Sequence, residues 1–304
     1  MEDIRKIQDE ILALKRANGA TILAHNYVDG AIQDIADFCG DSLELSRKAK
    51  ENAAETIIFC GVRFMGETAK LLCPCARVIM PNRSAGCPMA DMCDVRALSS
   101  FRASHPDHVF VAYVNTTAET KSHVDVCVTS GNAERIVSQL GTSRPIMFLP
   151  DKNLGANLNR RLGIEMELWD GCCPHHHGVA VRDIEAARAE YPGAPVMVHL
   201  ECQPEVVDVA DAALSTAGML KYVENSSAQT FIVGTEIGMM HRLEVCFPER
   251  RFVALKPVIS CSDMKSITLS QVREALLGGG HEVILEKDLM TKAVKPIERM
   301  LEMS

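Results

Sequence analysis

The sequence predicts an α/β protein of three similar α/β/α lobes, each with a short parallel sheet, related by a pseudo-threefold axis. Two observations lead to this prediction. Short apolar runs rich in β-branched residues alternate with helical patterns along the 304 residues, which is typical of parallel strands covered by helices on both faces. The same polar residues also recur three times in register, which indicates an internal triplication.

The repeat is anchored on polar residues that end three apolar runs, at His25, Tyr113 and His199, which are 88 and 86 residues apart. A hydroxyl follows each anchor after 17 residues, and a cysteine follows after 60 to 62 residues. One matched spacing arises easily by chance, whereas three features in register three times do not. The matched hydroxyls are Ser42, Ser130 and Thr216, and the matched cysteines are Cys87, Cys173 and Cys261.

The elements of each copy are expected in the same order. The opening helix should end near Gly19, and its apolar stripe comprises Ile4, Ile7, Ile11, Leu12 and Leu14. Buried strands are then predicted at 21–27, 109–115 and 195–201, and second strands at 56–60, 145–149 and 230–233. The predicted copies span 1–107, 108–194 and 195–282, and residues 283–304 are expected to form a strand and a helix that pack back on the first lobe.

Composition narrows the class of protein. Asp and Glu number 40 against 32 Lys and Arg, and no basic block stands out, so nucleic acid is not an expected partner. The first residues lead directly into a charged amphipathic pattern, unlike a signal peptide, and no apolar run reaches the roughly 18 residues of a membrane span. We therefore expect a cytoplasmic protein that does not contact a membrane.

Twelve cysteines are many for such a compartment, and they favour metal ligation or buried thiols over disulfides. No CxxC pair occurs, so the usual signature of zinc ribbons and thioredoxin-type sites is missing. Cysteines in apolar surroundings are predicted to be small core residues, and these are Cys39, Cys60, Cys127 and Cys246.

Ligands of parallel α/β units bind at the carboxyl ends of strands, facing helix N-termini. Three lobes around one axis would bring Cys87, Cys173 and Cys261 together there. Three thiolates suit a [4Fe–4S] cluster, which then keeps one iron open as a Lewis acid. A zinc site that takes its fourth ligand from the histidines at 175–177 is an alternative, and a chain without metal is another.

The three hydroxyls have two interpretations. Ser and Thr at helix starts are usually N-caps, but three of them aimed at one axis would form a phosphate cradle, which the shared register favours. His25 and His199 are either hydrogen-bonded core residues or ligand-binding groups. The strand ends further offer donors for carboxylates and one candidate base, Glu201; these residues are Tyr27, Tyr113, Asn115 and Glu201.

Over nearly its whole length the sequence resembles the quinolinate synthase (quinolinate synthetase A) family. Each motif alone is weak, but in this order they are specific. The motifs are Leu23-Ala24-His25-Asn26-Tyr27, Gln33-Asp34-Ile35-Ala36-Asp37, Gly40-Asp41-Ser42-Leu43, Phe64-Met65-Gly66-Glu67, Ala85-Gly86-Cys87-Pro88-Met89-Ala90-Asp91, Tyr113-Val114-Asn115, Val233-Gly234-Thr235-Glu236-Ile237-Gly238 and Cys261-Ser262-Asp263-Met264-Lys265.

The resemblance implies a transferase of three α/β/α lobes with a [4Fe–4S] cluster held by three cysteines. It implies condensation of iminoaspartate with dihydroxyacetone phosphate to quinolinate, releasing phosphate and two waters, in de novo NAD biosynthesis. It also implies a functional link to an enzyme that produces iminoaspartate, and a monomer or homodimer.

Carried over by position, the family's cluster ligands fall on Cys87, Cys173 and Cys261. Its substrate-binding residues fall on His25, Ser42, Tyr113, Asn115, Ser130, His199, Glu201, Ser215 and Thr216, and its catalytic residues on Tyr27, His199 and Glu201. The sequence departs from the family pattern in small ways. Cys172 adds a thiol beside Cys173, Leu200 replaces a usual proline, and the C-terminal cysteine pair of longer members is absent.

Other functions remain open on the sequence alone. An iron–sulfur hydro-lyase acting on another hydroxy acid would keep the cluster and change the substrate. A non-catalytic iron–sulfur sensor would use the cluster as a switch, and a zinc-stapled binding protein would have no cluster.

Overall fold

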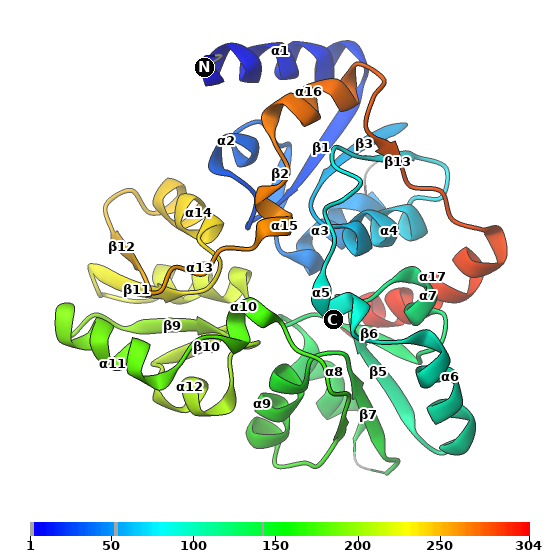
Figure 1. The fold of residues 1–304 in the computed structure, drawn as a ribbon, viewed down its shortest axis with the longest axis vertical. Coiled ribbons are helices and arrows are strands. Elements are labelled where there is room, and N and C mark those ends of the chain that lie inside the picture. The colour runs from blue at the N-terminus through cyan, green and yellow to red at the C-terminus, as the bar shows by residue number, and fades with distance from the viewer. Residues whose placement is uncertain (1–2, 52–53, 142) are drawn as a thin grey trace.

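The structure, a computed structural model, describes residues 3–51, 54–141 and 143–304. Three sheets of five, four and four strands are flanked by helices, and Figure 1 shows three lobes arranged around a common centre. The predicted α/β fold of three similar lobes with parallel sheets is confirmed. Within the described residues, no helix is long and apolar enough to cross a bilayer.

Each lobe contains the same nine elements in the same order. The first lobe comprises α1 (Ile4–Ala17), β1 (Ala20–His25), α2 (Gly30–Gln33), β2 (Phe38–Gly40), α3 (Ser42–Glu51), β3 (Thr56–Cys60), α4 (Arg63–Leu72), β4 (Arg77–Met80) and α5 (Pro88–Asp91). The second comprises α6 (Val95–Ser104), β5 (Val109–Tyr113), α7 (Ala118–Lys121), β6 (Val126–Val128), α8 (Ala133–Leu140), β7 (Ile146–Leu149), α9 (Lys152–Leu162), β8 (Glu167–Leu168) and α10 (Pro174–His177).

The third lobe comprises α11 (Val181–Glu190), β9 (Val196–His199), α12 (Pro204–Val209), β10 (Ala212–Leu214), α13 (Thr216–Glu224), β11 (Thr230–Gly234), α14 (Gly238–Cys246), β12 (Arg251–Ala254) and α15 (Ser262–Lys265). The chain ends with α16 (Leu269–Leu276), β13 (His281–Glu282) and α17 (Lys287–Met303). The first strand of each lobe lies between the second and third strands, and all pairs inside a lobe are parallel. All three lobes therefore present their strand ends in the same order.

One repeated aspartate fixes the start of each first strand. Asp37, Asp125 and Asp211 each accept a hydrogen bond at 2.8 Å from a backbone N–H of that strand. Each is also paired with a cation on the helix that precedes the strand, and these pairs are Lys15–Asp37, Arg102–Asp125 and Arg188–Asp211. Each aspartate therefore ties the opening helix to the sheet of its own lobe.

The first strands read as almost continuous apolar runs because helices cover both faces of the sheets. Every residue of β5 and β9 is buried, and only one residue of β1 is partly exposed. The polar residues that follow these strands therefore lie at the inner edge of each lobe, where the lobes meet.

The C-terminal segment joins two lobes. Strand β13 pairs with β4 of the first sheet, but in antiparallel orientation. Helix α17 packs against α4 of the first lobe and also against β6, α7 and α8 of the second. Its contacts thus extend beyond the first lobe, on which residues 283–304 were expected to pack.

The predicted core cysteines are confirmed only in part. Cys60 and Cys127 are buried, Cys39 is half-buried and Cys246 is exposed. For Cys246 the prediction is wrong, because it ends α14 on the solvent side, beside the exposed Val245, while Leu243 is the residue of this turn that enters the core.

Candidate active site

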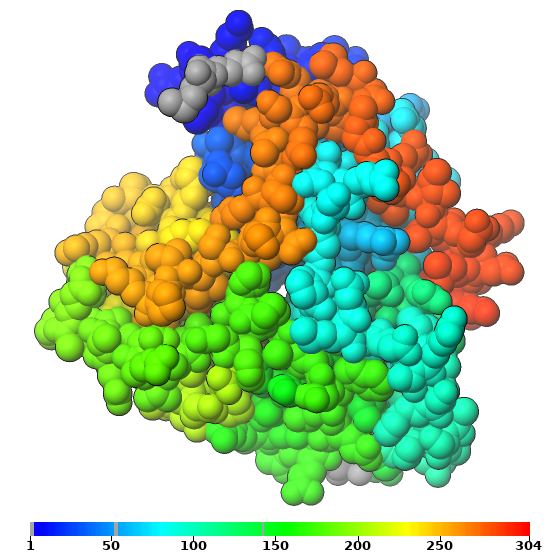
Figure 2. Space-filling model, in the orientation of Figure 1, coloured from blue at the N-terminus to red at the C-terminus, as the bar shows by residue number. Residues whose placement is uncertain are grey.

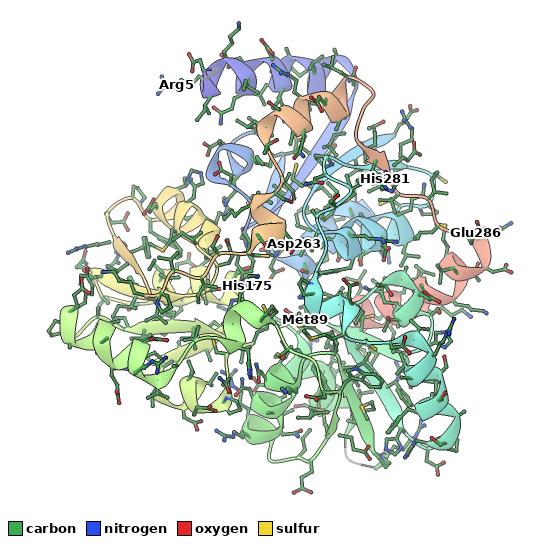
Figure 3. All side chains as sticks on the ribbon, in the orientation of Figure 1. Arg5, Met89, His175, Asp263, His281 and Glu286 are labelled. Atoms are coloured by element: carbon green, nitrogen blue, oxygen red, sulfur yellow. The ribbon has the colours of Figure 1, made fainter. Side chains whose placement is uncertain are left out.

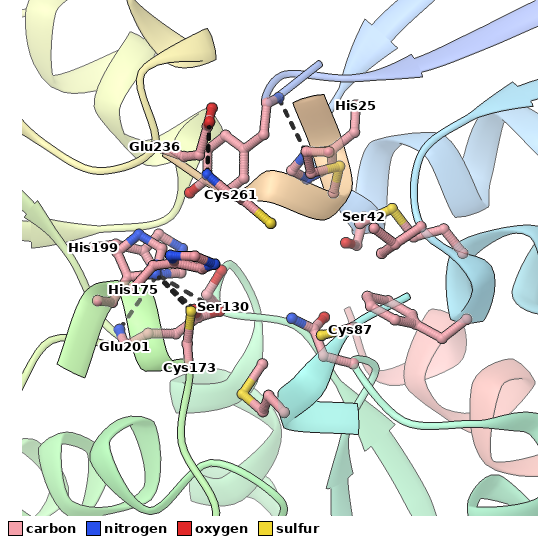
Figure 4. Close-up of a pocket in the computed structure, with 18 of the residues that line it drawn as sticks. His25, Ser42, Cys87, Ser130, Cys173, His175, His199, Glu201, Glu236 and Cys261 are labelled. Carbon is pink, nitrogen blue, oxygen red and sulfur yellow. Dashed lines mark hydrogen bonds and ion pairs between the residues drawn. The ribbon is translucent and has the colours of Figure 1, made fainter. Parts of the chain in front are cut away.

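One cavity at the centre of the molecule is formed by all three lobes (Figure 4). It collects every residue assigned from the sequence to the cluster, the substrate or catalysis except Ser215, which is not among its lining residues. Of the histidines offered as zinc ligands, His175 and His176 line it and His177 does not. The candidates that line it are His25, Tyr27, Ser42, Cys87, Tyr113, Asn115, Ser130, Cys173, His199, Glu201, Thr216 and Cys261.

The three cysteines occupy equivalent backbone positions. Cys87, Cys173 and Cys261 each lie directly before a short helix, α5, α10 or α15, a few residues after the fourth strand of the lobe. Figure 2 shows the three segments, coloured cyan, green and orange, meeting near the centre of one face of the molecule. Figure 4 shows their sulfur atoms facing a common space.

Burial raises the pKa of Cys87 to about 12 and also raises the pKa of Cys173 and of Cys261. Two backbone amides of the following helix act in the opposite direction on each thiol. Such thiols become thiolates when a bound cation replaces the proton. The three sulfurs are therefore a soft donor set that fits an iron–sulfur cluster or zinc.

A second group of possible ligands overlaps with this set. Cys173, His176 and Glu201 each offer a ligand atom, and these atoms lie within 4.8 Å of one another. In the structure they are hydrogen-bonded among themselves, with His176 Nδ1 at 3.3 Å from Cys173 Sγ and 2.9 Å from Glu201 Oε2.

The first strands of the first and third lobes end in the same local structure. The N–H of Tyr27 donates to His25 Nδ1 at 3.2 Å, and the N–H of Glu201 donates to His199 Nδ1 at 3.3 Å. Burial lowers the pKa of His25 to about 3 and that of His199 to about 4, so both rings are neutral at pH 7. Because Nδ1 accepts a hydrogen bond, the proton lies on Nε2, where each ring can donate.

Glu201 is the centre of a hydrogen-bonded network. Its Oε1 accepts from Tyr113 Oη at 2.7 Å, and its Oε2 interacts with His176 Nδ1 at 2.9 Å. Burial alone would raise the pKa of Glu201, but the hydrogen bonds from His176 and Tyr113 hold it below its usual range. Glu201 is therefore an ionised carboxylate in a buried site.

The network continues across the lobes to Tyr27. His176 Nε2 lies 2.9 Å from Thr235 Oγ1, and Thr235 Oγ1 lies 2.6 Å from Tyr27 Oη. Burial raises the pKa of Tyr27 well above its ordinary value, so its phenol is protonated and can donate. One continuous path thus joins Tyr27 of the first lobe to Glu201 of the third, through a histidine of the second.

The hydroxyls at two helix starts are not used as caps. Asp41 Oδ1 accepts the N–H groups of Leu43 and Glu44 at the start of α3, so Ser42 is not the N-cap. Ser215 Oγ caps α13 by accepting the N–H of Gly218 at 3.1 Å. The N-cap interpretation is therefore wrong for Ser42 and Thr216, whose neighbours cap the helices.

The remaining polar groups also face the cavity. Thr216 Oγ1 accepts from Asn26 Nδ2 at 2.9 Å, and Ser130 lies in the turn before α8. The buried Asn115 Oδ1 has no hydrogen-bond partner within the described residues, as expected for a group that meets a ligand.

Several residues of the site were not predicted from the sequence. Thr235 and Glu236 follow the buried strand β11 and lie near its inner end, and His176 was considered only as a zinc ligand. The polar residues after the predicted strand 230–233 were a usable signal, because the same signal identified His25 and His199.

The chain is similar to known proteins over nearly its whole length. The sequence pattern of the family described as Quinolinate synthetase A protein matches residues 9–302. The chain is 44% identical to the quinolinate synthase of Aquifex aeolicus (strain VF5), over 100% of this chain and 96% of the relative. It is also 44% identical to the quinolinate synthases of Desulforudis audaxviator (97% and 99% covered) and Methanoregula boonei (99% and 99% covered).

Proposed function

This chain belongs to the quinolinate synthetase A family, and we propose that it condenses iminoaspartate with dihydroxyacetone phosphate to quinolinate, releasing phosphate and two waters, for de novo NAD biosynthesis. One structural observation supports this specific reaction in addition to the family membership. A single cavity combines three thiols, three hydroxyls and the polar strand ends of three lobes. The thiols are suited to bind a metal centre, the hydroxyls to bind a phosphate, and the polar strand ends to bind a dicarboxylic substrate.

Cys87, Cys173 and Cys261 would hold a [4Fe–4S] cluster with one iron free of protein ligands. Bound there, the cluster would supply a Lewis acid that polarises a hydroxyl or carbonyl oxygen. The three sulfurs are half-buried and line one cavity, which fits this group.

Ser42, Ser130 and Thr216 are proposed to bind the phosphate of the triose. Ser42 and Thr216 are the first residues of α3 and α13, and amides of a first helical turn lack partners inside the helix and attract anions. Asp41 and Ser215 accept hydrogen bonds from the first N–H groups of these helices, so the hydroxyls of Ser42 and Thr216 are not needed as caps and can face the cavity.

The neutral histidines are proposed to bind carboxylate or carbonyl oxygens. His25 and His199 each have Nε2–H as the free donor. The unpaired amide oxygen of Asn115 can accept a hydrogen bond from a substrate hydroxyl or amine. The low pKa of both histidines keeps their donor pattern across the neutral range, since neither ring takes up a second proton above about pH 4.

Glu201 is proposed to accept and return protons during dehydration and ring closure. It is ionised and therefore able to accept a proton, and Tyr113 and His176 already direct their donors at it. Tyr27 is proposed to donate from the segment that follows β1, while Thr235 and His176 connect the two groups. Such a path allows a proton to move between them without bulk water.

The test is anaerobic purification followed by assay of quinolinate from iminoaspartate and dihydroxyacetone phosphate. We expect turnover with these substrates and none with simple hydroxy acids, which separates this function from a hydro-lyase. An iron-loaded protein that dehydrates hydroxy acids and forms no quinolinate would overturn the proposal.

A further inference from the structure

The second and third lobes each have a buried carboxylate at the same backbone position. Asp151 and Glu236 each lie two residues beyond the end of the third strand of their lobe, β7 or β11, and are 0% and 1% exposed. The strand pairing gives them the same position, because Leu149 pairs with Ala112 and Gly234 pairs with Val198.

One of these carboxylates holds the backbone of the cysteine in its own lobe. Glu236 Oε1 accepts the N–H of Cys261 at 3.1 Å (Figure 4). Asp151 instead caps α9, where its Oδ1 accepts the N–H groups of Asn153 and Leu154. Cys261 is thus held by a carboxylate that follows a neighbouring strand.

The first lobe lacks this residue, because its equivalent position is Val62, two residues beyond β3. The Cys87 loop instead receives a carboxylate from the third lobe. Asp263 Oδ1, on α15, accepts the N–H of Gly86 at 2.8 Å. Figure 3 shows Asp263 near the centre of the molecule, where α15 lies beside the first lobe.

A second contact between the same two segments supports this arrangement. Asn82 Nδ2 donates to Ser266 O at 3.0 Å and to Ser266 Oγ at 2.9 Å, and Asn82 Oδ1 accepts the N–H of Ser84. The loop before Cys87 is therefore bound to the segment after Cys261 near both of its ends.

We propose that Asp263 is the positioning residue for Cys87, supplying from the third lobe the kind of carboxylate contact that Glu236 supplies to Cys261. One helix, α15, then orients two of the three cysteines. The Cys87 loop is ordered for metal binding only while the first and third lobes are docked. This inference rests on the proposed function, in which Cys87 is a ligand.

The test compares Asp263→Ala with Asp263→Asn in the reduced, metal-free full chain, by the rate at which each cysteine is alkylated. Loss of a hydrogen bond to a charged acceptor should raise the alkylation rate of Cys87 roughly tenfold. The rate at Cys173, resolved from Cys172 by tandem mass spectrometry, should stay unchanged, because the hydrogen bond of the Asp263 carboxylate is made to the Cys87 loop at Gly86. Asn retains an acceptor oxygen and should keep the wild-type rate at Cys87.

An unchanged Cys87 in Asp263→Ala, an equal rise at Cys173, or an Asn variant that behaves like Ala would each overturn the inference. If Asp263→Ala does not fold, Asn82→Ala is used in its place, and it should raise the alkylation rate of Cys87 relative to that of Cys173. An unchanged alkylation rate of Cys87 in Asn82→Ala would also overturn the inference.

Iron content separates this inference from the proposed function. After anaerobic loading, Asp263→Ala should release iron to a chelator faster than wild type and Asp263→Asn should not. A wild-type chain that takes up no iron would defeat the proposed function, while the alkylation result would still decide the role of Asp263.

Discussion

The first and third lobes share a backbone design and differ in the chemistry they present. Both end their first strand with a buried histidine whose Nδ1 accepts the N–H of the residue two positions later. That residue is Tyr27 in the first lobe and Glu201 in the third. A protonated phenol and an ionised carboxylate are thus displayed at equivalent strand ends, facing one cavity. The repeat fixes where a side chain stands, and the residue at that position fixes what it can do.

The largest effect is expected when the carboxylate of the third lobe is neutralised. Glu201→Gln should lower kcat for quinolinate formation by roughly a hundredfold or more, since it removes a positioned proton acceptor. Its iron content and visible absorption should match wild type. Glu205→Gln, an exposed residue a few positions later, is the matched control. Near-normal turnover of Glu201→Gln would refute the role assigned to this carboxylate.

The corresponding change in the first lobe should have a smaller effect. Tyr27→Phe removes the phenol oxygen that lies 2.6 Å from Thr235 and should reduce kcat roughly tenfold to a hundredfold. Tyr222→Phe changes a residue of α13 that packs beside Phe231 and is not among the residues that line the cavity, so it should have no effect on steady-state kinetics. A Tyr27→Phe enzyme as slow as Glu201→Gln would mean that the two strand ends are not functionally distinct.

The path between the two strand ends is tested by Thr235→Val, which keeps the shape and removes the bridging hydroxyl. We expect kcat to fall about threefold to tenfold, which corresponds to the loss of ordinary hydrogen bonds. Thr230→Val, at the opposite end of the same strand, controls for the effect on β11. If both variants retain full kcat, the path through Thr235 and His176 carries no proton.

The repeated aspartates should affect stability and leave chemistry unchanged. Asp125→Asn should lower the free energy of unfolding by about 2 kcal/mol, because it weakens charge-assisted hydrogen bonds to Arg102 and Phe110. Burial opposes ionisation, but Arg102 and the backbone hold the pKa of Asp125 below its ordinary value. Its stabilisation is therefore complete above the unfolded pKa and is lost as pH falls through the lower folded pKa. Chemical denaturation of wild type and variant at pH 7 and near pH 3 measures this, and an equal difference at both pH values would contradict it.

The sequence predicted best the features that repeat. Spacing alone located His25, Tyr113, His199 and the three cysteines, because equivalent positions in equivalent lobes meet at one centre. It did not predict contacts between lobes, since these depend on residues that differ from copy to copy.

His176, for example, stands where the other lobes have Ala90 and Met264, three residues after the cysteine. Glu236 stands where the first lobe has Val62 and the second has Asp151. The residue type at such positions differs between the copies, and only the packing of the lobes shows which partners the side chains meet. The position of α17 could not be predicted for a similar reason. Its apolar pattern indicates that one face is buried, but it does not indicate which lobe covers that face.

The convergence of three cysteines from three lobes is tested most directly by iron and sulfide analysis of anaerobically loaded protein. Wild type and Cys172→Ser should each contain about four iron and four sulfide per chain, as one cubane cluster requires. Cys87→Ser, Cys173→Ser and Cys261→Ser should each lose most of both. Full iron and sulfide in any of these three variants, or a single bound zinc in wild type, would contradict the account.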